Sequence, residues 1–208
     1  MKKYCLKVLS LALMFTVLLF SIGQTAIAEE ISSNHPVRWS IKSSTGEYYQ
    51  TKISVDQLPA NHVMRSYILT AVSNWNATPT KILCSKTAFN SSNVDLSIGT
   101  SDFFSKLGNP YAYTILTDTN GLVLIDPSTD FIKTNGKIKY ANIQYNSYIP
   151  SFVLEDSDYC VGMAVHEIGH VYGFGHTSNY FSVMNVSRYA FYPSPQTYDI
   201  NVANSFYK

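Results

Sequence analysis

The chain has 208 residues, with 15 lysines and arginines against 14 aspartates and glutamates. A chain of this length favours one domain and allows two at most. The near balance of charges leaves no excess of basic residues to neutralise phosphates. We therefore expect no nucleic-acid partner.

The first 28 residues have the three parts of a secretory signal peptide. Three of the first seven residues are lysines, Val8–Phe20 is almost wholly apolar, and Ala26 and Ala28 are the small residues that a signal peptidase reads. An uncleaved membrane anchor is the alternative, but the apolar run is short for a bilayer span of about 20 residues. We predict cleavage after Ala28, secretion, and no stable membrane anchor in the mature chain.

The mature chain, residues 29–208, is predicted to be one extracellular, monomeric domain. Loss of three lysines and no acids leaves 12 basic against 14 acidic residues, a net charge of −2. Cys5 leaves with the signal, so Cys84 and Cys160 are the remaining cysteines. An even number of cysteines in an oxidising compartment predicts a Cys84–Cys160 disulfide. Two reduced, buried thiols are the alternative.

In chain order, Val37–Ile41 alternates apolar and polar residues and predicts a first strand. Asp56 and Pro59 are typical of a helix start, and Pro79 lies just beyond the expected end. Between them, apolar residues recur at the spacing of one buried helix face. They are Met64, Tyr67, Ile68, Ala71, Val72 and Trp75.

Short β-like segments follow, separated by Asn-Gly turns at residues 120–121 and 135–136. We predict strands at Lys81–Cys84, Val94–Ile98, Ala112–Leu116, Leu122–Ile125 and Ile138–Tyr145.

A second helix should begin near Asp156, Ser157 or Asp158, any of which can cap it. Its apolar stripe comprises Val161, Ala164, Val165, Ile168 and Tyr172. A third helix is expected over residues 198–207, with Ile200, Val202, Ala203 and Phe206 partly inward. Strand, helix, several strands, helix, loop and helix make an α+β domain.

The second helix contains His166-Glu167-Ile168-Gly169-His170. Residues four apart lie on one helix face, so two imidazoles can converge on one ion. Glu167 lies one step round from His166 and can reach a water at the metal without being a ligand itself.

Gly173 can adopt the left-handed conformation that ends a helix, after which the chain can return His176 as a third ligand. Three protein ligands leave a fourth tetrahedral position for water, as in catalytic zinc sites. A purely structural zinc site would need a fourth protein ligand. Cys160 is rejected for that role, because it lies about 240° round the helix from His166.

The run HEIGHVYGFGH resembles the long zinc-binding motif of metzincin metallopeptidases, and matrixins in particular. The resemblance implies one catalytic domain with a twisted mixed sheet, an active-site helix, a backing helix and a C-terminal helix. It also implies that Met184, in Ser182-Val183-Met184-Asn185, forms an apolar floor beneath the histidines. Tyr198-Asp199-Ile200 is similar to the start of the matrixin C-terminal helix.

The sequence also departs from that family. It lacks the cysteine-switch motif of vertebrate matrixin propeptides, and Val186 stands where astacins have a tyrosine ligand. Only His35 and His62 remain for a second, structural zinc, and we expect ordinary histidines there. A calcium loop is possible at Asp118, Asn120, Asp126 and Asp130, although plain turn chemistry is favoured.

We therefore expect a secreted, zinc-dependent metalloendopeptidase with one catalytic Zn²⁺ held by His166, His170 and His176. Glu167 would act as general base on a zinc-activated water. A protein or peptide substrate would lie extended along an edge strand, and residues 186–192 would shape its pocket. The alternatives are a secreted, non-catalytic zinc-binding interaction module and a zinc hydrolase that acts on a non-peptide bond.

Overall fold

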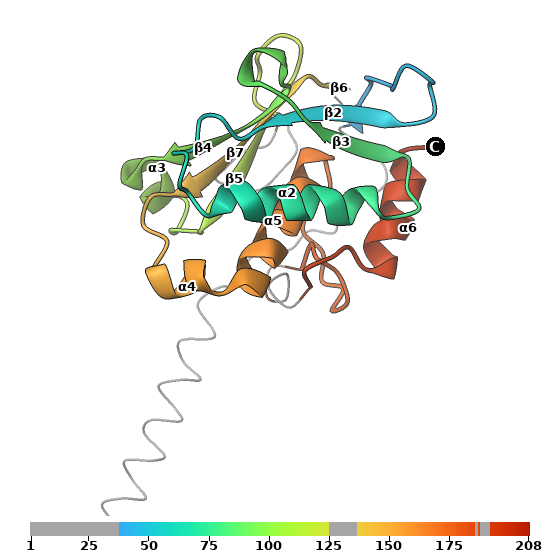
Figure 1. The fold of residues 1–208 in the computed structure, drawn as a ribbon. Coiled ribbons are helices and arrows are strands. Elements are labelled where there is room, and N and C mark those ends of the chain that lie inside the picture. The colour runs from blue at the N-terminus through green and yellow to red at the C-terminus, as the bar shows by residue number, and fades with distance from the viewer. Residues whose placement is uncertain (1–37, 125–136, 186, 188–191) are drawn as a thin grey trace, which may run out of the picture.

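The computed structural model describes residues 38–124, 137–185, 187 and 192–208. The predicted signal peptide, His35, Asp126 and Asp130 lie outside this part of the chain. The described residues form a mixed α/β structure with a mixed sheet and five α-helices, as expected for an α+β domain (Figure 1). Within them, no helix is both long and apolar enough to cross a bilayer.

The main sheet has five strands in the order β3-β2-β4-β7-β5. Neighbours among β3, β2, β4 and β7 are parallel, and β5 is antiparallel to β7 at the edge. The strands are β2 Tyr49–Ser54, β3 Ile82–Lys86, β4 Val94–Gly99, β5 Ala112–Thr117 and β7 Tyr140–Asn146. The predictions for β3, β4, β5 and β7 are confirmed to within a few residues.

The predictions at both ends of the strand region need correction. The expected first strand is only β1, Arg38–Trp39, which pairs with β6, Lys137–Ile138, outside the main sheet. The expected strand at Leu122–Ile125 is reduced, in its described part, to a bridge between Val123 and Thr117. β2 was not predicted, because a threonine takes its buried position 51 and weakens the apolar alternation.

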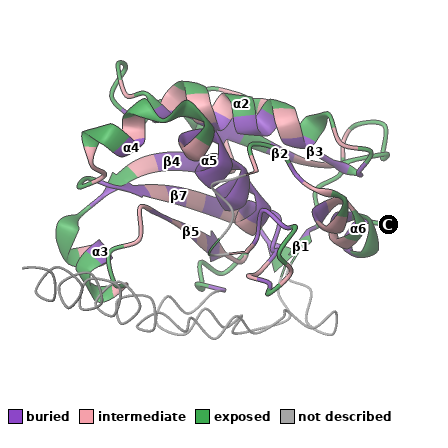
Figure 2. Cartoon of the chain, turned by 90° about the horizontal axis from the view of Figure 1, so that it is seen from below, coloured by how far each residue is buried: buried purple, intermediate pink, exposed green. Residues whose placement is uncertain are grey.

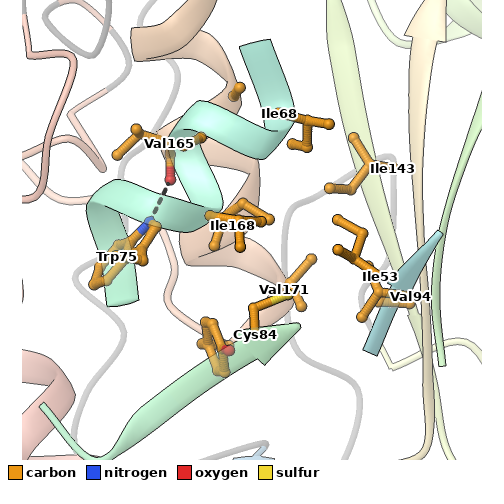
Figure 3. Packing of buried hydrophobic residues seen from close by; sticks show 14 of the residues in the cluster. Ile53, Ile68, Trp75, Cys84, Val94, Ile143, Val165, Ile168 and Val171 are labelled. Carbon is orange, nitrogen blue, oxygen red and sulfur yellow. Dashed lines mark hydrogen bonds between the residues drawn. The ribbon is translucent and has the colours of Figure 1, made fainter. Parts of the chain in front are cut away.

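Two long helices, α2 (Met64–Asn76) and α5 (Ser157–Val171), pack on the same side of the sheet (Figure 1). The predicted stripe of α2 is buried, except that Tyr67 is only partly covered. Trp75 reaches across, and its Nε1 donates to the Val165 carbonyl at 2.9 Å (Figure 3). This hydrogen bond and the apolar contacts around it hold α5 against α2.

The start of α2 was predicted too early. Asp56 and Pro59 lie in a turn region, and the helix begins only at Met64. Asp56 instead approaches the Arg65 guanidinium at 3.8 Å, so its charge faces the first turn from outside.

Three further helices complete the described fold: α3 (Ser101–Lys106), α4 (Ser151–Glu155) and α6 (Thr197–Phe206). A 3-10 turn spans Phe89–Ser91. α6 confirms the predicted third helix to within one residue at each end. Its capping box joins the Gln196 and Asp199 side chains to each other's backbone N–H groups.

The predicted disulfide is wrong, because Cys84 and Cys160 are separate, buried thiols. Cys84 pairs in register with Thr51 and lies beside Val171, at the C-terminal end of α5 (Figure 3). Cys160 is in the first turns of the same helix, eleven residues before Val171 and thus about 16 Å away along the axis. A disulfide requires Cα atoms within about 7 Å.

Candidate metal centre

The helix α5 brings the predicted site into the interior. Asp156 caps it by accepting from Tyr159 N at 3.0 Å, which confirms the predicted start. Every residue from Cys160 to Gly169 is buried, because α2 and the sheet cover most sides of this helix (Figure 2). A buried core helix normally carries apolar side chains. The burial of His166 and Glu167 in α5 therefore needs a specific reason.

The three predicted histidines meet at one point. His170 Nε2 lies 3.1 Å from His166 Nε2 and 3.2 Å from His176 Nε2. In the described part of the chain, this is the one group of three or more histidine, cysteine or carboxylate side chains whose ligand atoms cluster closely enough for a metal ion. The predicted ligand set is therefore brought together.

Backbone carbonyls orient two of the imidazoles. His166 Nδ1 lies 2.7 Å from the Val183 carbonyl oxygen, and His170 Nδ1 lies 2.8 Å from that of Phe174. A carbonyl only accepts, so each Nδ1 carries a proton and each Nε2 is left to face its partners. Burial, followed by the neighbouring His170 and His176, holds the pKa of His166 well below its usual value.

This arrangement fits a metal ion. Neutral rings whose Nε2 lone pairs face each other at 3.1 Å repel, and a cation between them removes that repulsion. Ligands at the usual 2.0–2.1 Å from a tetrahedral zinc lie about 3.3 Å apart, close to the observed separations. Carbonyls that hold the Nδ1–H groups are the common outer partners of metal-binding histidines. The cluster could therefore hold a metal ion.

The turn after α5 delivers the third histidine. Gly173 has a φ of 79°, the left-handed conformation expected from the sequence. Its N–H bonds the His170 carbonyl at 2.8 Å and ends the helix. Reversal at Gly173 places the Phe174 carbonyl against His170 and brings His176 back to the cluster.

Residues from both ends of the described chain complete the end of α5. Trp39 Nε1 donates to the Val171 carbonyl at 2.7 Å, and the Tyr207 hydroxyl donates to the Tyr172 carbonyl at 2.8 Å. These carbonyls have no partner within the helix, so the two side chains satisfy them in the interior. Sequence reasoning missed both contacts, which join residues 132 and 35 positions apart.

The predicted methionine turn also lies at the site. Asn185 N donates to the Ser182 carbonyl at 3.2 Å, which closes a tight turn around Val183 and Met184. Met184 is buried and packs with its sulfur against Gly169. The same turn supplies the carbonyl that orients His166.

Asp199 on α6 holds that turn, a role that was not predicted. Its carboxylate accepts from Ser182 Oγ at 2.5 Å and from Val183 N at 3.1 Å. Asp199 is 1% exposed, and burial raises the pKa of its carboxyl despite these hydrogen bonds. The sequence signal for this role was an acidic residue in the first turn of α6, two residues after Thr197.

Glu167 follows His166 on α5, and its side chain is buried and bonded to the edge strand. Thr114 Oγ1, on β5, donates to Glu167 Oε2. Glu167 is 4% exposed. Its charge contributes, after burial, to holding the pKa of Tyr145 well above its usual value. The predicted general base therefore has a defined carboxylate orientation.

The remaining candidates do not join the site. The Cys160 thiol donates to the Val153 carbonyl at 3.2 Å, away from the histidines, as expected. His62 accepts from Met64 N at 3.3 Å beside the start of α2. Asp118 accepts from the backbone N–H groups of Asn120 and Leu122 at 2.8 and 2.9 Å, which is turn chemistry. Of the expected pocket residues 186–192, only 187 and 192 are described.

No protein-family model matches the chain, and a search among curated proteins finds no match either. The resemblance to metzincins therefore remains an expectation from the sequence motif alone. The activity has to be inferred from the chain's own chemistry.

Proposed function

We propose that this protein is a secreted, zinc-dependent endopeptidase of the metzincin type. The convergence of three imidazole Nε2 atoms beside a buried, hydrogen-bonded glutamate carries the proposal. A site that only holds metal has no need of that carboxylate, whose burial costs free energy. Three protein ligands, with no fourth among the described residues, also match a catalytic zinc site better than a structural one.

The position of β5 supports a peptide as the substrate. β5 is an edge strand whose residue Thr114 contacts the site. On its outer side, the only bridge among the described residues joins Thr117 to Val123. An extended peptide could hydrogen-bond to the rest of that edge, as in strand addition. The scissile bond would then pass close to Glu167.

The chain's own residues would share the chemistry of hydrolysis. His166, His170 and His176 would hold the zinc ion, which when bound supplies Lewis-acid chemistry to water and to the scissile carbonyl. Glu167 would accept a proton from the attacking water and pass it to the leaving nitrogen as the carbon–nitrogen bond breaks. The carbonyls of Val183 and Phe174 would keep two ligand rings in orientation throughout.

The test is an assay of the purified mature chain on casein and on a quenched peptide library. We expect internal cleavage that a chelator abolishes and that added zinc restores. Zinc-loaded, folded protein that cleaves no peptide would contradict the proposal and favour a non-catalytic module. Cleavage of esters or amides without cleavage of peptides would favour the other hydrolase class.

A further inference from the structure

We propose that Thr114 is a positioning residue, which fixes the carboxylate of Glu167 for its role at the metal site. This inference rests on the proposed function for its catalytic part. Its structural part, a hydrogen bond that holds the carboxylate in place, stands on geometry and can be tested without any substrate.

The side chain of Thr114 lies where a donor to Glu167 is needed. Its Oγ1 is within hydrogen-bond distance of Glu167 Oε2 and 3.3 Å from the Glu167 backbone oxygen. The residue is 3% exposed, so water does not compete freely for this hydroxyl. The hydroxyl therefore lies near both the carboxylate and the backbone carbonyl of Glu167, and the carboxylate is the nearer acceptor.

Strand pairing holds the backbone around Thr114. β5 pairs with β7 along its whole length, and Thr114 stands opposite Ile143. Because threonine is branched at Cβ, few χ1 rotamers are open to it. The donor is thus a short side chain on a paired strand, directed at a longer and more flexible glutamate side chain on α5.

A second buried hydroxyl near Glu167 does not share this role. Tyr145 also faces α5 from β7, and the charge of Glu167 affects its pKa. Its hydroxyl nevertheless makes no hydrogen bond to any described residue. Thr114 and Tyr145 therefore form a natural comparison, with one hydroxyl bonded to the carboxylate and the other not.

The catalytic test compares Thr114→Val, Thr114→Ser and the wild type. Valine matches the shape of threonine without the hydroxyl, and serine keeps the hydroxyl. A hydrogen bond to a charged group corresponds to a change of about 10- to 100-fold. We expect Thr114→Val to lose that factor in kcat, with KM and zinc content unchanged, and Thr114→Ser to recover most of it.

Two control variants separate this role from general packing. Thr51→Val makes the same change on another strand, β2, at a buried threonine. The Thr51 hydroxyl lies 3.0 Å from the Tyr172 hydroxyl. Tyr145→Phe removes the neighbouring hydroxyl that is not bonded to Glu167. Both should keep the wild-type kcat. Should Thr114→Val not fold, Thr114→Ser and Thr114→Ala, which differ by the hydroxyl alone, give the same comparison.

A thermal double-mutant cycle tests the hydrogen bond itself. Thr114→Val should lower the melting temperature by about 5 °C in the wild-type background. It should lower it by much less in a Glu167→Ala background, where no carboxylate is left to hold. Equal shifts in the two backgrounds would overturn the inference.

The two proposals fail in different ways. A wild-type chain that binds zinc but hydrolyses no peptide removes the proposed function, and the melting cycle still decides whether Thr114 holds Glu167. An active wild type with full kcat in Thr114→Val overturns the positioning role alone. Loss of kcat in both Thr114→Val and Thr114→Ser also overturns it, because the hydroxyl is then not the cause.

Discussion

The thioether sulfur of Met184 occupies the space in which a side chain on Gly169 would begin. A Cβ built on Gly169 comes well inside 3.0 Å of that sulfur, a separation that real Cβ atoms essentially never show. Gly169 lies between His166 and His170 on α5. The methionine sulfur therefore packs against the helix backbone between His166 and His170, at a distance that a residue with a Cβ would not allow.

Gly169→Ala should consequently destabilise the protein and weaken metal binding. Overpacking of a core site typically costs about 1–3 kcal/mol. Because the added methyl group pushes the methionine turn away, the Val183 carbonyl should also shift from His166. Denaturant unfolding and zinc titration measure the two effects. In a Met184→Ala background, which makes room, Gly169→Ala should cost much less, and an equal cost in the two backgrounds would count against this explanation.

Glu167→Gln should keep the fold and the metal but lose nearly all peptidase activity. The amide is almost isosteric with the carboxylate, and its oxygen can still accept from Thr114. General acid–base assistance is worth about 10²–10⁴-fold, so a loss of that order is expected in kcat. The control is His170→Ala, which should lose both zinc and activity. If Glu167→Gln keeps more than about a tenth of wild-type activity, Glu167 is not the general base.

The protein should bind about one zinc ion per chain, in keeping with its single described histidine cluster. Metal analysis of protein purified without added zinc gives the stoichiometry. Zinc at a hundred times its Kd should stabilise the fold by about 2.7 kcal/mol, so a chelator should lower the melting temperature. Folded protein with no bound metal and no shift upon zinc addition would be the contrary result.

Both thiols should be reduced and unreactive in the folded protein. Burial raises the pKa of Cys84 to about 12 and that of Cys160 to about 11, so neither forms the nucleophilic thiolate near pH 8. A thiol reagent should label neither cysteine in native protein and both after denaturation without reductant. Absence of label in the denatured sample would restore the disulfide that the sequence suggested.

The histidine cluster could be predicted because its spacing is local. His166, Glu167 and His170 share one helix, and Gly173 reverses the chain over the next few residues toward His176. These relationships depend on helix periodicity and on one left-handed residue, and both can be read along the sequence.

The supports of the site could not be read in this way. Trp39, Thr114 and Asp199 reach α5 or the methionine turn from 132, 53 and 16 residues away. No local pattern fixes such distances, because they follow from how the sheet and helices pack. The disulfide prediction failed for the same reason, because an even number of cysteines does not show at which end of α5 each thiol lies.

The Asp199 contact has a consequence for the order in which the centre can form. α6 follows all other described elements in the chain, yet its carboxylate holds the turn whose carbonyl orients His166. A chain in which the three histidines have met still lacks this brace until α6 has packed against the turn. The orientation of His166 is thus coupled to the packing of α6, so the histidine cluster is complete only when the whole described fold has formed.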